Sequence, residues 1–201
     1  LPPTSNPFPE QIANPSAFET REYNATIGLP LIGASSAYAI GATGKDITIA
    51  VIDTGVLSDH PDLQGAVVGM YDVCADTACR GFDNNGNRTT ITRQRGDVDA
   101  EGHGTLVSGV IAARRQDDYR SSADDNISNG IQGAAYESSI LGIRADSPGS
   151  CGRSGEDEDC VFSDGDLARA IQYAVDRGAS IINMSLGGEV DNDPTLENAV
   201  R

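Results

Sequence analysis

The short run Ile47–Ile52 (ITIAVI) constrains the fold more than any other segment of this chain. Every residue in it is apolar or β-branched, with no alternation of polar and apolar positions. Such a strand is covered on both faces, as a central strand of a parallel sheet is. The run leads into Asp53, Thr54 and Gly55, and functional groups of open α/β sheets gather at the carboxyl ends of strands. Asp53 is therefore a candidate functional carboxylate, although aspartate is also a common turn residue.

Further strand-like and helix-like runs alternate along the chain. This alternation predicts an α/β fold with a parallel sheet and helices on its faces, built as one domain over residues 23–201. Five of the nine prolines lie within residues 1–15, so we expect residues 1–22 to form an extended segment. The other predicted strands are Val67–Val73, Ser139–Ile143 and Ser180–Leu186, and the predicted helices are His103–Ala113, Asp164–Arg177 and a helix that begins at Pro194.

The net charge of −16 limits the partners of the chain. Such a charge repels nucleic-acid backbones and anionic lipid surfaces, and no apolar run approaches the roughly 20 residues that a membrane span needs. We therefore expect no nucleic-acid partner and no membrane contact. We also expect no organic cofactor. Hard cations such as calcium are compatible with the charge.

The four cysteines form two local pairs, Cys74 with Cys79 and Cys151 with Cys160. We predict two short-loop disulfides and an oxidising compartment, although four cysteines allow three pairings. The spacing lacks the CxxC pairs typical of a zinc site. The first residues, LPPTSNPFPEQIANP, do not have the pattern of a signal peptide, so a secreted protein would be present in processed form.

His103 is one of two histidines, and it lies between Gly102 and Gly104 in the first turn of a predicted helix. The helix dipole disfavours an imidazolium there, so a histidine that takes up a proton needs an anion nearby. Asp53 could supply that anion by bonding one ring nitrogen, leaving the other free to remove a proton from a nucleophile. The two residues together are the base half of a catalytic triad.

Three motifs, VIDTGVLSDHPDL (Val51–Leu63), GHGTLVSGVIAA (Gly102–Ala113) and IINMSLGG (Ile181–Gly188), resemble the subtilisin-like serine proteases in order and spacing. The resemblance runs from about Tyr23 to the end of the chain. It implies a three-layer subtilisin-like fold with a mainly parallel sheet, of which this chain holds an incomplete part. AYAIGATGKDITIAVIDTG also resembles subtilisin-like passenger domains of bacterial autotransporters.

By this resemblance Asp53 is the triad aspartate and His103 the general base. Ser185, Leu186 and Gly187 would form the strand that pairs with an extended protein or peptide substrate, since an edge strand offers unpaired backbone groups. Residues 160–163 would lie on the other side of the substrate. That places the acidic run GEDED at 155–159 nearby. We expect this run to be a solvated loop, and the alternative is that it favours basic substrate residues on the amino-terminal side of the cleavage point. Asp62 matches a calcium-ligating position, and residues 124–132 follow the predicted helix where a calcium loop often lies. This loop is longer and differently spaced from the usual pattern, so no further ligand is assigned.

The nucleophile of the family is missing from the chain. Subtilisin-like enzymes carry their serine in a GTSMA-like segment after the histidine, and this sequence has none. The helix beginning at Pro194 also stops after about two turns. We therefore expect the amino-terminal part of a secreted or cell-surface serine endopeptidase, with the serine supplied after Arg201, for example by a companion polypeptide. The isolated chain would be inactive.

Two other functions remain open at this stage. A DTG after a strand is also typical of aspartic proteases, but only one is present and the α/β pattern argues against their all-β fold. A pseudoprotease or peptide-binding module would keep the groove without the nucleophile. Neither Ser185 nor Ser108 fits a nucleophile motif, and His60, which precedes Pro61, is expected to be structural.

Overall fold

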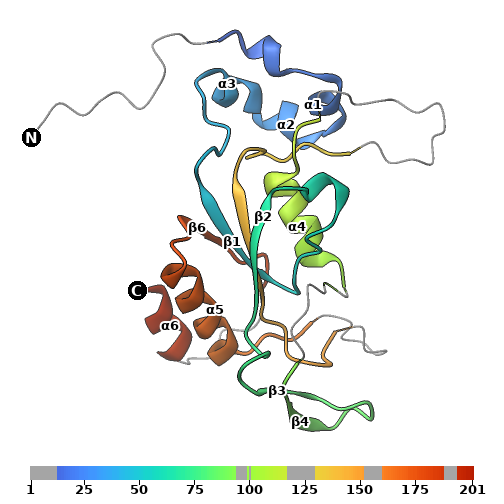
Figure 1. Cartoon of the computed structure of the whole chain (residues 1–201), viewed down its shortest axis with the longest axis vertical. Helices are drawn as coiled ribbons and strands as arrows, with labels where there is room; N and C mark the ends of the chain where they lie inside the picture. The colour runs from blue at the N-terminus through green and yellow to red at the C-terminus, as the bar shows by residue number, and fades with distance from the viewer. Residues whose placement is uncertain (1–12, 94–98, 100, 117–129, 152–159, 188–193) are drawn as a thin grey trace, which may run out of the picture.

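The computed structural model contains a four-stranded, wholly parallel sheet with the strand order β2-β5-β1-β6 (Figure 1). The prediction of a parallel α/β sheet is therefore confirmed. The strands are β1 (Thr48–Asp53), β2 (Val67–Asp72), β5 (Ser139–Arg144) and β6 (Ile181–Asn183). The structure describes residues 13–93, 99, 101–116, 130–151, 160–187 and 194–201.

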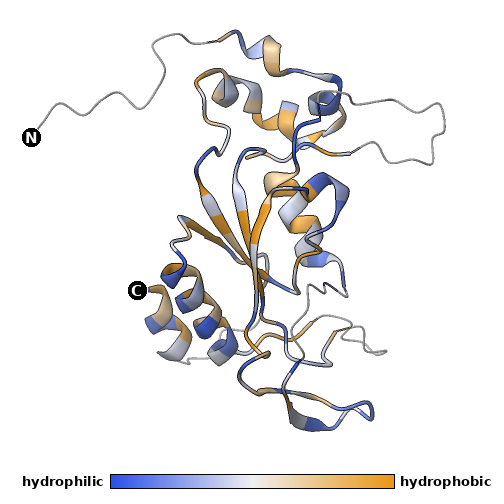
Figure 2. Cartoon of the chain, in the orientation of Figure 1, coloured by the Kyte–Doolittle hydropathy of each residue, from blue (hydrophilic) through white to orange (hydrophobic). Residues whose placement is uncertain are grey.

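Strand β1 separates two apolar cores because its side chains alternate between the faces of the sheet. Ala50 and Ile52 pack in a cluster with helix α5 (Asp164–Asp176). Ile49 and Val51 pack in a second cluster with helix α4 (His103–Ala112). The strands are accordingly among the most hydrophobic parts of the chain (Figure 2). One helix on each face of the sheet gives the three layers expected from the resemblance.

Most predicted elements are present, with shifted ends. Ser163 caps α5 by accepting the N–H of Asp166, and the chain leaves the helix at Gly178, whose φ is 74°. Strand β6 ends at Asn183, whereas we predicted a strand to Leu186. Among the described strands it pairs with β1 alone, and their ladder stops at Asn183. Helix α6 (Pro194–Val200) packs against α5 (Figure 1).

The prediction of an extended segment over 1–22 is wrong for residues 13–22, and 1–12 lie outside the described residues. A 3-10 turn, η1 (Pro15–Phe18), begins where the Asn14 side chain accepts the N–H of Ser16. Proline favours the first helical position because it has no N–H to satisfy there. Three short helices follow at the amino ends of the strands (Figure 1), namely α1 (Arg21–Ala25), α2 (Gly28–Ile32) and α3 (Ala34–Ala39).

An aromatic cluster attaches these helices to the rest of the chain. Tyr23, Tyr38 and Tyr136 are buried together, with Phe18 packed against them. The Tyr38 hydroxyl donates to the Ala134 carbonyl at 3.0 Å. Burial raises the pKa of Tyr38 to about 12, although a Gln132 hydrogen bond acts in the opposite direction. The neutral phenol is therefore the form that this packing favours.

A hairpin that we did not predict lies at the opposite end of the sheet, formed by β3 (Cys79–Phe82) and β4 (Arg88–Ile91) (Figure 1). Its turn, 83–87, is closed by Asp83, whose carboxylate accepts the N–H groups of Asn85 and Asn87. Hydrogen bonds from Asn87 lower the pKa of Asp83. Asp83 thus closes this turn through its side chain.

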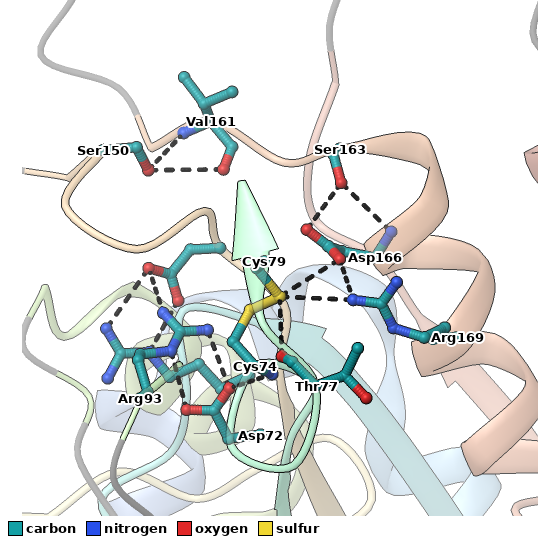
Figure 3. Close-up of a disulfide and its surroundings, with 12 residues drawn as sticks. Asp72, Cys74, Thr77, Cys79, Arg93, Ser150, Val161, Ser163, Asp166 and Arg169 are labelled. Atoms are coloured by element: carbon teal, nitrogen blue, oxygen red, sulfur yellow. Dashed lines mark hydrogen bonds and ion pairs between the residues drawn. A yellow bond between two sulfur atoms is a disulfide. The ribbon is translucent and has the colours of Figure 1, made fainter. Parts of the chain in front are cut away.

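Both predicted disulfides are confirmed, Cys74–Cys79 and Cys151–Cys160. The first joins the end of β2 to the start of β3, and it lies beside Asp166 and Arg169 of α5 (Figure 3). It thereby attaches the hairpin to the core of the domain. None of the described helices is long and apolar enough to cross a membrane.

Candidate active site

Asp53 and His103 lie together at the carboxyl end of β1. Nδ1 of His103 is 2.8 Å from Oδ1 of Asp53. The aspartate side chain is 1% exposed and the histidine side chain 50% exposed, so one end of the pair is buried and the other is open to solvent. Oδ1 of Asp53 also accepts the N–H of Thr54 at 2.7 Å. A carboxylate bonded to Nδ1 favours the tautomer with its proton on that nitrogen, which leaves Nε2 free to accept a proton.

The two glycines around His103 are needed for different reasons. Gly102, the N-cap of α4, has a φ of 80°, in the left-handed region that glycine occupies without a steric penalty. Gly104 has an ordinary φ but lies against the turn after β1. A Cβ at Gly104 would be 2.0 Å from the Gly55 carbonyl oxygen and 3.0 Å from the Asp53 Cβ. The absence of a side chain at Gly104 therefore lets α4 approach Asp53 closely.

Asp99 is a part of the site that the sequence analysis missed. Its Oδ1 accepts from the Thr54 hydroxyl and the Gly102 N–H, and its Oδ2 accepts from the N–H and hydroxyl of Thr105. This carboxylate therefore contacts both the turn after β1 and the start of α4. The only hint in the sequence is an acidic residue shortly before the histidine, a pattern that does not identify its partners.

A second charged cluster lies at the ends of β2 and β5. Arg93 pairs with Asp72 at 2.8 Å and with Asp146 at 2.8 Å, as part of the surroundings of the Cys74–Cys79 disulfide (Figure 3). Arg144, the register partner of Asp53, donates from Nε to Asp146 at 2.7 Å. Burial alone would lower the pKa of Arg144, but hydrogen bonding and charge from Asp146 raise it. The positive charges of these arginines are thus balanced by nearby carboxylates.

The predicted substrate strand continues from the edge strand β6. Ser185 and Gly187 are exposed, while Leu186 packs against the core on the α5 side. The Ser185 hydroxyl accepts from Asn183 Nδ2 at 3.0 Å. Within the described ranges no hydrogen bond joins a serine to His103. Ser108 is wholly buried in α4.

The segment expected on the other side of the substrate leads into α5. Phe162 forms an isolated antiparallel β-bridge with Asp146, and the Val161 carbonyl accepts the Ser147 N–H at 2.7 Å. A groove of about 970 Å³ lies between this segment and the β3–β4 hairpin. Neither Asp53 nor His103 lines it. The acidic run at 155–159 is outside the described residues.

Asp62 offers a carboxylate, the type of oxygen ligand that a calcium ion prefers. The Asp62 carboxylate accepts from Gln116 Nε2 at 3.3 Å and from the Ile131 N–H at 3.4 Å. If the Gln116 side-chain amide were turned by 180°, its oxygen would lie beside Asp62 in place of its nitrogen. A Cβ at Gly130 would lie 2.5 Å from Asp62 Oδ1, so the chain passes close to this carboxylate. Residues 124–129 of the expected calcium loop are outside the described part.

Two other groups of potential ligands have structural roles. Nδ1 of His60 accepts the N–H of Asp62 and caps the turn η2 (Pro61–Leu63), in agreement with the structural role expected for it. Among the described residues, one cluster of three potential metal ligands is found, formed by Cys74, Cys79 and Asp166. Its two sulfurs are joined to each other in a disulfide, so they are not available as thiolates.

Comparisons with known proteins identify the family of the chain. Residues 44–201 match the sequence profile of the Subtilase family, Peptidase S8. Thermitase of Thermoactinomyces vulgaris is 37% identical over 188 residues, which cover 93% of this chain and 52% of thermitase. The major intracellular serine protease of Bacillus subtilis is 34% identical over 174 residues, covering 87% of this chain and 44% of that protein. The chain thus spans about half the length of these relatives.

The fold is also found in a solved structure. The crystal structure of fervidolysin from Fervidobacterium pennivorans, described as a keratinolytic enzyme related to subtilisin, aligns with a TM-score of 0.60 and 27% sequence identity. The alignment covers 90% of this chain and 24% of the fervidolysin chain.

Proposed function

Because the chain belongs to the Subtilase family, we propose that it provides the aspartate and histidine of a serine endopeptidase. The observation that carries this proposal is the 2.8 Å contact between His103 Nδ1 and Asp53 Oδ1, with the aspartate buried and the imidazole half exposed. An accessible base oriented by a buried carboxylate is what nucleophilic catalysis by serine requires.

In the proposed reaction, Nε2 of His103 removes the proton from a serine hydroxyl as its oxygen attacks the peptide carbonyl carbon. The Asp53 carboxylate stabilises the imidazolium that forms. The imidazolium then donates its proton to the leaving amine as the peptide C–N bond breaks, which leaves an acyl-enzyme. Water, activated by the same histidine, hydrolyses the acyl ester and regenerates the serine.

The serine belongs, in this proposal, to sequence beyond Arg201 or to a companion polypeptide. Two observations support this assignment. The printed sequence has no GTSMA-like segment, and no serine among the described residues hydrogen-bonds to His103. Ser185 is assigned instead to substrate binding, together with Leu186 and Gly187, because this segment extends an edge strand that a peptide could join.

The same proposal covers location and metal. Two disulfides favour an oxidising compartment, so we assign the protein to the secreted or cell-surface subtilases. Asp62, with Gln116 beside it, would hold a structural calcium through side-chain oxygens. The bound ion would contribute stability and no step of the reaction.

The aspartic-protease alternative is wrong, because the fold is a parallel three-layer sandwich of the subtilisin type. A pseudoprotease remains the other outcome of the test. The native protein is treated with a fluorophosphonate, which reacts with an activated serine, and the labelled peptide is identified by mass spectrometry. We expect the label on a serine outside residues 1–201, and its loss in His103→Ala. A label on Ser185, or no label together with no peptide hydrolysis, would overturn the proposal.

A further inference from the structure

We infer that Asp99 is a positioning residue that holds the first turn of α4 against the turn after β1 and so keeps His103 within hydrogen-bonding distance of Asp53. The inference rests on the proposed function, because it assigns a task to a carboxylate in the same site. The inference goes beyond the proposed function because it names a third ionisable residue on which the geometry of the Asp53–His103 pair depends.

The Asp99 carboxylate accepts four hydrogen bonds, two on each oxygen. Oδ1 accepts from the Thr54 hydroxyl at 2.8 Å and from the Gly102 N–H at 2.9 Å. Oδ2 accepts from the N–H of Thr105 at 2.7 Å and from its hydroxyl at 2.5 Å. Thr54 directly follows Asp53, whereas Gly102 and Thr105 bracket His103. A single carboxylate therefore bonds to neighbours of both members of the pair.

The two threonine hydroxyls extend this connection. A hydroxyl has one proton to donate, and each of these donates it to Asp99. Their lone pairs are thereby turned toward backbone N–H groups of the opposite segment. Thr54 accepts from the Gly104 N–H at 3.1 Å, and Thr105 accepts from the Leu57 N–H at 2.9 Å. Each threonine thus joins the turn after β1 to the first turn of α4, in an orientation that Asp99 sets.

The start of α4 needs these acceptors because its N-cap is a glycine. The first N–H groups of a helix have no partner within the helix, and a capping side chain normally satisfies some of them. Gly102 has no side chain to offer. The acceptors come instead from Thr54, for Gly104, and from Asp99, for Thr105. His103 lies in this same turn, so its backbone position depends on them.

Asp99→Asn in the intact native protein tests this inference, because asparagine keeps the shape but replaces one acceptor oxygen with a donor nitrogen. In either orientation of the amide, its NH₂ group faces one of the two pairs of hydrogen-bond donors that now bond to a carboxylate oxygen. We expect kcat on a peptide substrate to fall about 10- to 100-fold, as a displacement of the base near 1 Å would produce. KM should stay within about twofold, because the hydrogen bonds on Asp99 go to the turn after β1 and to the start of α4. Asp59→Asn, which removes an exposed carboxylate from the loop between β1 and η2, should leave both constants unchanged.

A spectroscopic measurement separates positioning from helix stability. We expect the proton between His103 Nδ1 and Asp53 to give a low-field ¹H resonance that shifts or broadens in Asp99→Asn but not in Asp59→Asn. If Asp99→Asn does not fold, Thr105→Val removes only the hydroxyl link. It should then show a smaller loss of kcat and the same type of change in the resonance.

A folded Asp99→Asn with wild-type kcat and an unchanged resonance would overturn the inference. So would a loss of kcat with the resonance unaltered, because the effect would then not pass through the Asp53–His103 bond. Failure of the proposed function has a different signature. In that case the wild-type protein neither hydrolyses peptides nor reacts with fluorophosphonate, while the His103 resonance still reports whether Asp99 positions the imidazole.

Discussion

Gly104→Ala is the substitution that most directly probes the approach of α4 to β1. The new Cβ would lie 2.0 Å from the carbonyl oxygen of Gly55, whereas real Cβ contacts essentially never fall below 3.0 Å. Both contacting groups are held by their surroundings, one in the backbone of the turn and the other in a helix. The helix must therefore move away by about 1 Å, and His103 moves with it.

The expected magnitude follows from this displacement. Overpacking of this kind destabilises a protein by about 1–3 kcal/mol. The contact between His103 Nδ1 and Asp53 Oδ1, now 2.8 Å, would lengthen beyond hydrogen-bonding distance. A misplacement of about 1 Å can reduce the rate of an enzyme about 100-fold. We therefore expect kcat to fall about 100-fold while KM changes little.

The assay measures kcat and KM on a chromogenic peptide together with the thermal midpoint of the intact protein. Two control variants separate the causes. Gly28→Ala adds a Cβ that meets nothing within 4 Å and has no positive φ, so it should be neutral. Gly102→Ala also meets no atom but has a φ of 80°, so it should lower stability with a smaller loss of kcat. A Gly104→Ala protein with wild-type kcat and thermal midpoint would refute the close-packing argument.

Three further predictions concern the pair, the aromatic cluster and the metal. Asp53→Asn should lower kcat about 10⁴-fold with little change in KM, because an amide no longer holds the required tautomer; steady-state kinetics would contradict this if kcat fell less than tenfold. The pKa of Tyr38 is raised to about 12 in the folded state, so the stability from its neutral phenol is present below pH 10 and lost as the pH rises toward 12. Denaturant unfolding at pH 9 and 11 should show this decrease, and Tyr38→Phe should reduce it. At a calcium concentration 100-fold above Kd, addition of a chelator should lower the thermal midpoint by about 5–10 °C. If the chelator lowers the midpoint of Asp62→Ala by the same amount, the ion binds elsewhere.

Much of the fold follows from local patterns. The uninterrupted apolar run that became β1 needs cover on both faces, and the structure supplies α4 on one face and α5 on the other. The α5 helix begins at a capping serine, Ser163, and ends before Gly178, as local helix signals predict. The cysteine pairs are close enough in sequence that a disulfide closes only a short loop. Each of these features depends on neighbours in the chain.

Other features depend on residues that are distant in sequence. The β3–β4 hairpin has few apolar residues, and its contacts with residues 148–149 and with the disulfide could not be read from its own pattern. The prediction of an extended segment failed over residues 13–22 because Asn14 and Thr20 each cap a short helix whose packing depends on the distant Tyr136. A local bias against regular structure at prolines was thus outweighed by burial of aromatic side chains.

The candidate site also has features that depend on local sequence and features that depend on the tertiary structure. By itself the sequence determined the two candidate catalytic residues, an aspartate at the end of a buried strand and a histidine between two glycines, because these residue types and their local settings are visible in the motifs. Only the tertiary structure decided how the two meet. A Cβ at Gly104 would clash with the Gly55 carbonyl oxygen at 2.0 Å, and Asp99 accepts four hydrogen bonds. Both features involve groups from separate segments of the chain. Hydrogen bonds and steric contacts act over a few ångströms, so they exist only after the fold has brought those segments together.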